Sequence, residues 1–191
     1  MEFLQIVPFV AMVAIITATI VRGVAIRRRT GDHAFAFLSA KGAQRASGLA
    51  FAVSGAALII ASGIGARAGP RDLSWLAAIL ATLGGGAVIV AQIQMGRAWR
   101  IGVRQGDAPE FVSHGLFRYS RNPIFLAMML VGFSAAMVSA FWWAWVSWAT
   151  FVVACIAQVR IEEAHLSASF GAQYHEFKAR VPRWLGKGGA E

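Results

Sequence analysis

A doubly basic loop directly before a long apolar run is the part of this sequence best suited to chemistry. The loop contains Arg118 and Arg121, and the apolar run begins at Pro123. Proline suits the first turn of a helix, where its missing N–H is not needed. The free backbone N–H groups and the dipole of a helix N-terminus favour an anion. Arg121 and Asn122 at this position therefore predict a site for a phosphate or carboxylate group.

A pair of carboxylates forms a second polar group, near the end of a later apolar run. Glu162 and Glu163 follow Arg160 in the sequence. Neighbouring residues on a helix point in different directions, so one glutamate can pair with Arg160 while the other faces inward. The predicted inward carboxylate is a candidate for the same site as the arginines.

The two polar groups lie at the outer ends of two apolar runs, 123–138 and 141–159. Almost no linker separates these runs, so they are typical of a tight helical hairpin around Ser139 and Ala140. A hairpin brings its first and last residues to the same end, which places Arg121 near the glutamates. The alternative interpretation of these charges is a network of interfacial salt bridges.

The composition indicates that the surrounding elements lie in a bilayer. Of the 191 residues, 58% are hydrophobic and only 14% are charged, which is more apolar surface than a soluble core of this size would bury. A membrane-spanning helix takes about 20 apolar residues. Segments of about this length predict an all-α membrane bundle of five transmembrane helices at residues 3–21, 48–66, 73–94, 123–138 and 141–159.

The distribution of basic residues predicts the orientation. Most Lys and Arg residues fall in the loops after the first and third runs and in the C-terminal tail, and only Arg67 and Arg71 fall on the other side. Basic loops stay in the cytoplasm, so we expect an inner or plasma membrane protein with its N-terminus outside and its C-terminus in the cytoplasm. Anionic lipid accounts for the net charge of +9, and no motif indicates a nucleic-acid partner.

Metal chemistry is not indicated by the cysteine and histidine residues. The single cysteine, Cys155, lies within an apolar run, and the four histidines show no metal-ligand spacing. We expect one membrane domain, in which residues 1–94 form a three-helix scaffold and residues 95–191 carry the chemistry. Its glycine-rich helices are compatible with a monomer or a homodimer.

The C-terminal tail has an amphipathic pattern. Leu166, Phe170, Tyr174 and Phe177 recur at helical spacing, and Gly171 interrupts them. This pattern predicts short amphipathic helices that lie on the membrane and could cover a site at its surface.

The polar half resembles a known family in two ordered motifs. Its residues 113–125 have the sequence SHGLFRYSRNPIF, followed by RIEE at 160–163, FGAQY at 170–174 and VPRW at 181–184. These resemble the G-x-Y/F-x-x-x-R-H-P-x-Y segment, the Glu-Glu pair and the F-G-x-x-Y tail of the isoprenylcysteine carboxyl methyltransferase and phospholipid methyltransferase family. Asn122 and Phe125 depart from the family's histidine and tyrosine. Asparagine cannot act as a base near neutral pH, so the resemblance assigns no acid or base to position 122.

The resemblance implies an integral membrane methyltransferase that uses S-adenosylmethionine and methylates a lipid or another lipophilic small molecule. It implies catalytic roles for Arg121, Glu162 and Glu163. The implied cofactor-binding residues are His114, Gly115, Tyr119, Arg121, Asn122, Pro123, Glu162 and Glu163. Arg118, Trp142 and Trp145 are the candidates for acceptor binding, although the tryptophans also suit an interfacial belt.

Two other functions remain open from the sequence. Membrane sterol reductases have a similar R-H-P segment, and their NADPH phosphates would suit arginines at a helix N-terminus equally well. A non-enzymatic membrane accessory protein with the same fold is the third possibility, because the histidine and tyrosine of the motif are replaced by Asn122 and Phe125.

Overall fold

The chain folds as a bundle of helices. A computed structural model describes residues 2–30, 42–96, 99 and 111–186, and within these ranges there is no β-strand. The all-α fold class is therefore confirmed. The elements in chain order are η1 (Glu2–Ile6), α1 (Val7–Thr30), α2 (Gly42–Ala68), α3 (Ser74–Met95), η4 (Gly115–Arg118), α4 (Pro123–Met137) and α5 (Trp142–Arg180).

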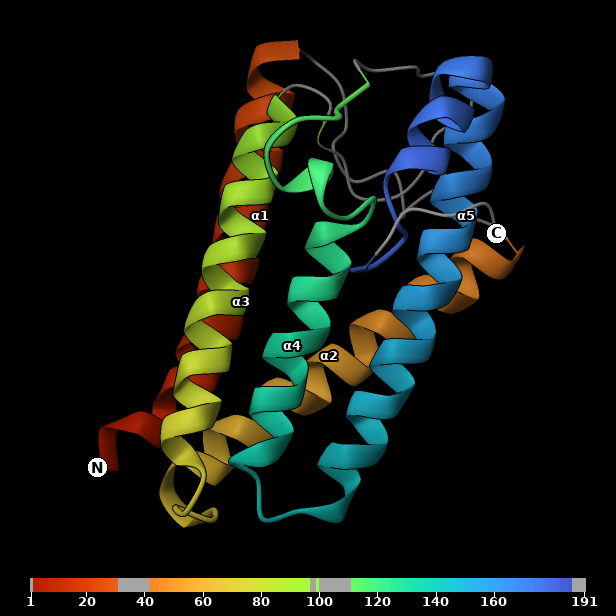
Figure 1. The fold of residues 1–191 in the computed structure, drawn as a ribbon. Coiled ribbons are helices and arrows are strands. Elements are labelled where there is room, and N and C mark those ends of the chain that lie inside the picture. Colours follow the sequence, from red (N-terminus) through yellow and green to blue (C-terminus); the bar gives the residue numbers. More distant parts are fainter. Residues whose placement is uncertain (1, 31–41, 97–98, 100–110, 187–191) are drawn as a thin grey trace.

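Four of the described helices are long and apolar enough to cross a membrane: those that contain α1, α2, α3 and α5. The fourth predicted span, α4, is also apolar but has only 15 residues. At about 1.5 Å per residue it is about 22 Å long, which is less than a hydrocarbon core of about 30 Å. The N-terminus of α4 is therefore recessed relative to neighbouring helices, and Figure 1 shows it beginning below the level at which α1 and α3 end.

The helices extend beyond the predicted apolar runs. Apolar composition ends α1 near residue 21 and α5 near residue 159, but the helices continue to Thr30 and Arg180. An apolar run indicates the part of a helix that contacts lipid. Polar residues with good helix propensity can continue the same helix beyond that part. The hairpin prediction is confirmed, because α4 ends at Met137 and α5 begins at Trp142.

Small residues allow the helices to pack closely. A side chain at Gly84 of α3 would meet Val131 of α4 at 2.7 Å, so glycine is needed where these two helices contact. Trp148 of α5 donates a hydrogen bond of 3.1 Å to the carbonyl of Met129, which ties the hairpin together. In Figure 1, α1, α3 and α4 run side by side while α2 crosses them obliquely toward α5.

The end of the bundle that contains the N-terminus is closed by backbone contacts. Gly65 of α2 and Gly69, just after α2, lie against the carbonyl of Val138 in the α4–α5 turn, with no room for a Cβ atom. The side-chain amide of Gln5 donates hydrogen bonds to the carbonyls of Gly69 and Pro70, at 3.0 and 2.9 Å. This end of the bundle is thus held by neutral groups whose hydrogen bonds are made.

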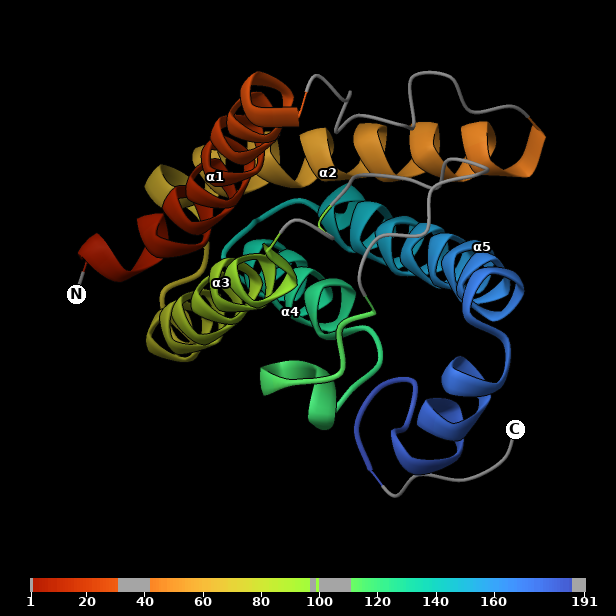
Figure 2. The same ribbon diagram turned by 90° about the horizontal axis from the view of Figure 1, so that it is seen from above.

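The straight part of α5, from Trp142 to the break at Gly171, is about 44 Å long and exceeds a hydrocarbon core of about 30 Å. Its backbone leaves the helical conformation at Gly171, where φ is +50°, so the predicted interruption at this glycine is confirmed. Residues before Gly171 continue the transmembrane helix instead of forming a separate short one. Figure 2 shows the segment after the break turning away from the α5 axis, and the last described residues curling back toward the loop before α4.

Candidate functional site

The loop that carries the arginines is fixed to the end of α3. Gln94 accepts a hydrogen bond of 2.8 Å from the backbone N–H of Leu116, at the start of η4. Gly115 has a φ of +61° and lies directly against the Gln94 amide, so a larger residue would be both strained and obstructed. Gly115 therefore has a structural role here, in addition to the cofactor contact expected of it.

Asn122 occupies the N-cap position of α4, and Pro123 is the first helical residue, as predicted. The Asn122 side chain does not cap the helix. Instead, its amide nitrogen donates hydrogen bonds to a carboxylate oxygen of Glu163 at 3.0 Å and to the carbonyl of Arg183 at 3.3 Å. Asn122 thus joins α4 to α5 and to the C-terminal segment through a neutral side chain.

The C-terminal segment 181–184 returns to the loop before α4. The backbone N–H of Arg121 donates to the carbonyl of Pro182 at 2.9 Å. The Ser120 hydroxyl donates to the carbonyl of Arg183 at 3.2 Å and accepts a hydrogen bond from the Asn122 N–H. These contacts bury the loop at Ser120, Arg121 and Asn122, with exposed fractions of 2%, 7% and 8%.

Glu163 is the centre of a charge network that consists of Arg121, Asn122, Glu163 and Arg183. Arg183 donates from Nε and Nη2 to the Glu163 carboxylate at 3.0 to 3.3 Å, in a bidentate arrangement. Arg121 lies farther away, with its Nε 3.7 Å from Oε1 and no hydrogen bond between them. The carboxylate is therefore shared unequally, and Arg183 is its main partner.

The charge of Arg121 is only partly compensated by Glu163. The Arg121 side chain is only 2% exposed, yet Nε and Nη1 have no hydrogen-bond partner among the described residues. One carboxylate cannot neutralise two guanidinium groups, so the charge network as a whole carries a surplus positive charge. Burial of such a charge without an anion is costly, so the geometry fits a ligand that presents a carboxylate or phosphate.

A buried tyrosine hydroxyl lies beside this arginine. Tyr174 is 1% exposed, and its Oη has no hydrogen-bond partner among the described residues, although it is close enough to interact electrostatically with Arg121. A phenol can donate one hydrogen bond, so it is a second donor for an anion at Arg121. Sequence reasoning did not include Tyr174 among the site residues; the signal for it was the last position of the FGAQY motif.

An apolar cluster beyond the bundle holds Tyr174 in place. Phe177 and Val181 are buried with it, and Leu166 and Phe170 pack at its edge. Phe111 is also partly buried and packs against the cluster, with its ring centroid 5.1 Å from that of Phe177 and 5.3 Å from that of Phe170. Apolar residues of the C-terminal helix thus pack against Phe111 and one another, and the predicted position of this segment on the membrane stays a prediction.

The structure separates the two adjacent glutamates. Glu163 faces the charge network, while Glu162 lies one helical turn after Gln158, whose amide donates to the carbonyl of Gln44 at the start of α2. Glu162 is partly buried and has no hydrogen bond or ion pair with another described residue. The expected pairing of either glutamate with Arg160 is also not found among the described residues; Arg160 is exposed.

Several residues that the sequence suggested for the site are exposed and make no contact in the charge network. His114, Arg118 and Tyr119 are exposed on the loop before α4, and Tyr119 is 68% exposed. Trp142 and Trp145 are also exposed, but they begin α5 at the opposite end of the bundle, with Trp145 about 27 Å along the helix from Glu163. The structure therefore does not bring the tryptophans to the site around Arg121.

The fold and the site define a class of protein: a bundle of apolar helices, four of them long enough to cross a membrane, with a buried charge network at one end. More specifically, the chain belongs to the phospholipid methyltransferase family, since the model of that family matches residues 73–173, which is more than half of the chain. The matched region contains α3, α4 and most of α5, including Glu163. A comparison with curated proteins gives no match. The protein is thus a membrane protein of a methyltransferase family.

Proposed function

We propose that this protein transfers a methyl group from S-adenosylmethionine to a small lipophilic acceptor at the cytoplasmic membrane face. The single observation that carries the proposal is the buried Arg121, which has two side-chain nitrogens without a hydrogen-bond partner among the described residues. S-adenosylmethionine has a carboxylate that would occupy these donors. The basic loops at this end of the bundle support the cytoplasmic orientation.

Arg121 and Tyr174 would hold the donor's carboxylate by hydrogen bonds from the guanidinium and the phenol. Glu162 is the carboxylate available for the donor's ammonium group, because the charge of Glu163 is already taken by Arg183. Asn122 would act indirectly, by keeping Glu163 and the C-terminal segment in place. These roles require no acid or base at position 122, which agrees with asparagine at this position.

The donor, when bound, supplies a methyl group on a sulfonium centre that can be transferred in line to a nucleophile. The protein's contribution is then alignment of the acceptor and exclusion of water. We assign the second task to the C-terminal segment, because the carbonyls of Pro182 and Arg183 accept hydrogen bonds from the backbone N–H of Arg121 and the hydroxyl of Ser120. An acceptor with an apolar body would approach from the lipid, where the recessed start of α4 is within the depth of the membrane.

Calorimetry on the detergent-purified protein tests this proposal. We expect heat of binding with S-adenosylhomocysteine, which retains the carboxylate and ammonium groups, and none with NADPH. Binding of NADPH alone would overturn the proposal in favour of a reductase, and binding of neither would favour an accessory protein. Mass spectrometry of membrane lipids from cells with and without the protein would then identify the species that gains one methyl group.

A further inference from the structure

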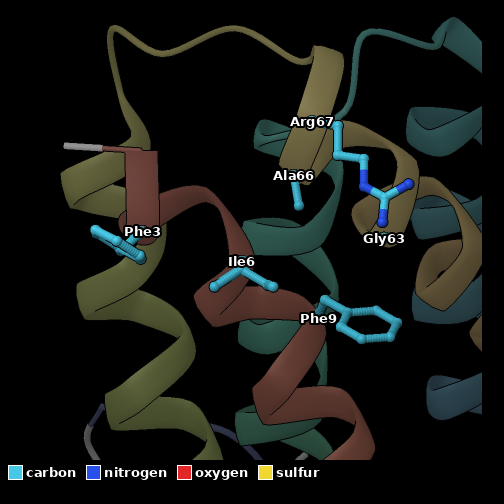
Figure 3. A pocket seen from close by; sticks show the side chains of 6 residues that line it. All are labelled: Phe3, Ile6, Phe9, Gly63, Ala66 and Arg67. Carbon is cyan, nitrogen blue, oxygen red and sulfur yellow. The ribbon is translucent and has the colours of Figure 1, made fainter.

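A cavity lies at the end of the bundle opposite to Arg121, between η1, the start of α1 and the end of α2. Its volume is about 360 Å³, and it is open on one side. Figure 3 shows Phe3 at one edge and Phe9 with Arg67 toward the other. The lining consists of apolar and small residues with one cation: Phe3, Ile6, Phe9, Gly63, Ala66 and Arg67.

Gly63 allows Phe9 to pack closely against α2 in the wall of this cavity. The ring of Phe9 lies 3.2 Å from where a Cβ of Gly63 would be, so the absence of a side chain lets the phenylalanine seat against α2. Gly63 lies about one helical turn deeper in the bundle than Arg67. The charged side chain of Arg67 and the apolar surface at Gly63 and Phe9 thus lie within about one helical turn of each other in this cavity.

Arg67 is the charged residue of this cavity. It is exposed in the last turn of α2 and has no hydrogen bond or ion pair with another described residue. The side chain is directed along the cavity on the side where Gly63 and Phe9 lie (Figure 3). An arginine at the end of a membrane helix reaches the level of the lipid headgroups, where a phosphate is the abundant anion.

We propose that this cavity is a binding site for one anionic phospholipid from the leaflet opposite to the methyltransferase site. Arg67 binds the phosphate, and the first part of one acyl chain lies against Ile6, Phe9 and Gly63. The charge pattern favours lipid over a second copy of the chain, because a symmetric dimer through this cavity would bring two Arg67 side chains together. The site is separate from Arg121 and does not depend on the proposed methyl transfer.

Native mass spectrometry with added phosphatidylglycerol tests the site. Wild-type protein in a mild detergent is compared with Arg67→Ala, which removes the cation, and with Ala66→Leu, which fills the cavity. The matched controls are Arg28→Ala, an exposed arginine in the last turn of α1, and Ala56→Leu, an exposed alanine elsewhere on α2. All variants are checked for unchanged thermal unfolding, so that loss of lipid is not loss of fold.

We expect Arg67→Ala to weaken the affinity for phosphatidylglycerol about fivefold, the effect of one arginine near a membrane surface. Ala66→Leu should weaken the affinity for phosphatidylglycerol and phosphatidylcholine alike, whereas Arg67→Ala should affect phosphatidylglycerol more strongly. Equal occupancy in the wild type and both variants would overturn the proposal. So would loss of a dimer peak in the two variants with lipid occupancy unchanged, since the cavity would then hold a second copy.

Discussion

The two ends of this bundle differ in how their buried polar groups are hydrogen-bonded. At the end near the N-terminus, helices approach through glycines, and the buried Gln5 donates to two backbone carbonyls. At the other end, two arginines share one carboxylate, and Arg121 keeps two side-chain nitrogens without a hydrogen-bond partner among the described residues. All the described side-chain atoms that are buried without a hydrogen-bond partner belong to this second end: Arg22 Nε, Arg121 Nε and Nη1, and Tyr174 Oη.

This contrast is informative because a buried polar atom without a partner lowers stability. At the end near the N-terminus, the buried amide of Gln5 has its hydrogen-bond partners. Buried polar groups can therefore be paired in this bundle. Unpaired donors at one end only are therefore a local feature, and local concentrations of this kind are expected where a ligand completes the hydrogen bonds.

Removing the unsatisfied cation should have the largest effect on ligand binding. We expect Arg121→Ala to weaken S-adenosylhomocysteine binding about 100-fold, since a charge-assisted hydrogen-bond pair is lost. Glu163 keeps its bidentate partner Arg183, so the fold should persist. Calorimetry measures the affinity, and Arg180→Ala, an exposed arginine at the end of α5, is the control. Unchanged affinity in Arg121→Ala would mean that the donor's carboxylate binds elsewhere.

Substitutions at the end near the N-terminus should change the stability of the protein and leave its affinity for S-adenosylhomocysteine unchanged. Gly65→Ala places a Cβ against the Val138 carbonyl, whereas Gly86→Ala on α3 places one in open space. We expect the first to destabilise the protein by about 2 kcal/mol and the second to be neutral or slightly stabilising. Thermal unfolding in detergent measures the difference. If Gly65→Ala weakened S-adenosylhomocysteine binding while stability held, the two ends would not be independent.

Arg183 should influence the ligand through Glu163. Without Arg183, the Glu163 carboxylate is free to pair with Arg121, which is 3.7 Å away, and this would neutralise the anion site. We expect Arg183→Ala to weaken S-adenosylhomocysteine binding about tenfold, with little change for 5′-methylthioadenosine, which lacks the carboxylate.

The two ligands separate this positioning role from a purely structural one. An equal loss of affinity for both would indicate that Arg183 only holds the C-terminal segment in place. Arg183→Lys should give an intermediate affinity, because lysine keeps the charge but not the bidentate geometry.

Asn122→His, which restores the residue common in the family, should have the smallest effect. A neutral histidine can donate one hydrogen bond and so can replace the contact with Glu163 or the one with the Arg183 carbonyl. We expect S-adenosylhomocysteine affinity to change by less than about threefold, as measured by the same calorimetry. A large loss of affinity would show that the asparagine amide, with its two N–H donors, is essential to this charge network.

Much of the fold could be predicted from the sequence because hydropathy and helix length are local properties. The apolar runs located the transmembrane helices, and the short linker at Ser139 and Ala140 located the hairpin. The ends of helices were less predictable. Polar residues after 159 can continue a helix, so α5 extends to Arg180 although its lipid contact is expected to end earlier.

The site was only partly predictable, since its partners come from distant parts of the chain. The hairpin argument correctly placed Arg121 near Glu163. It did not identify Arg183 or Tyr174, because their positions depend on the break at Gly171 and on packing around Phe111. No local pattern reports which of several arginines will pair with a given carboxylate.

The hydrogen bonds from the loop before α4 to Arg183 connect residues that are 61 and 63 positions apart. A ribosome therefore releases the arginine loop long before it releases the segment that covers it. Until synthesis of the chain is almost complete, the guanidinium of Arg121 stays open to water and to other anions. On the proposed function, the chain therefore gains its affinity for the donor only after the last residues are made, and we expect a chain shortened before Pro182 to bind no donor.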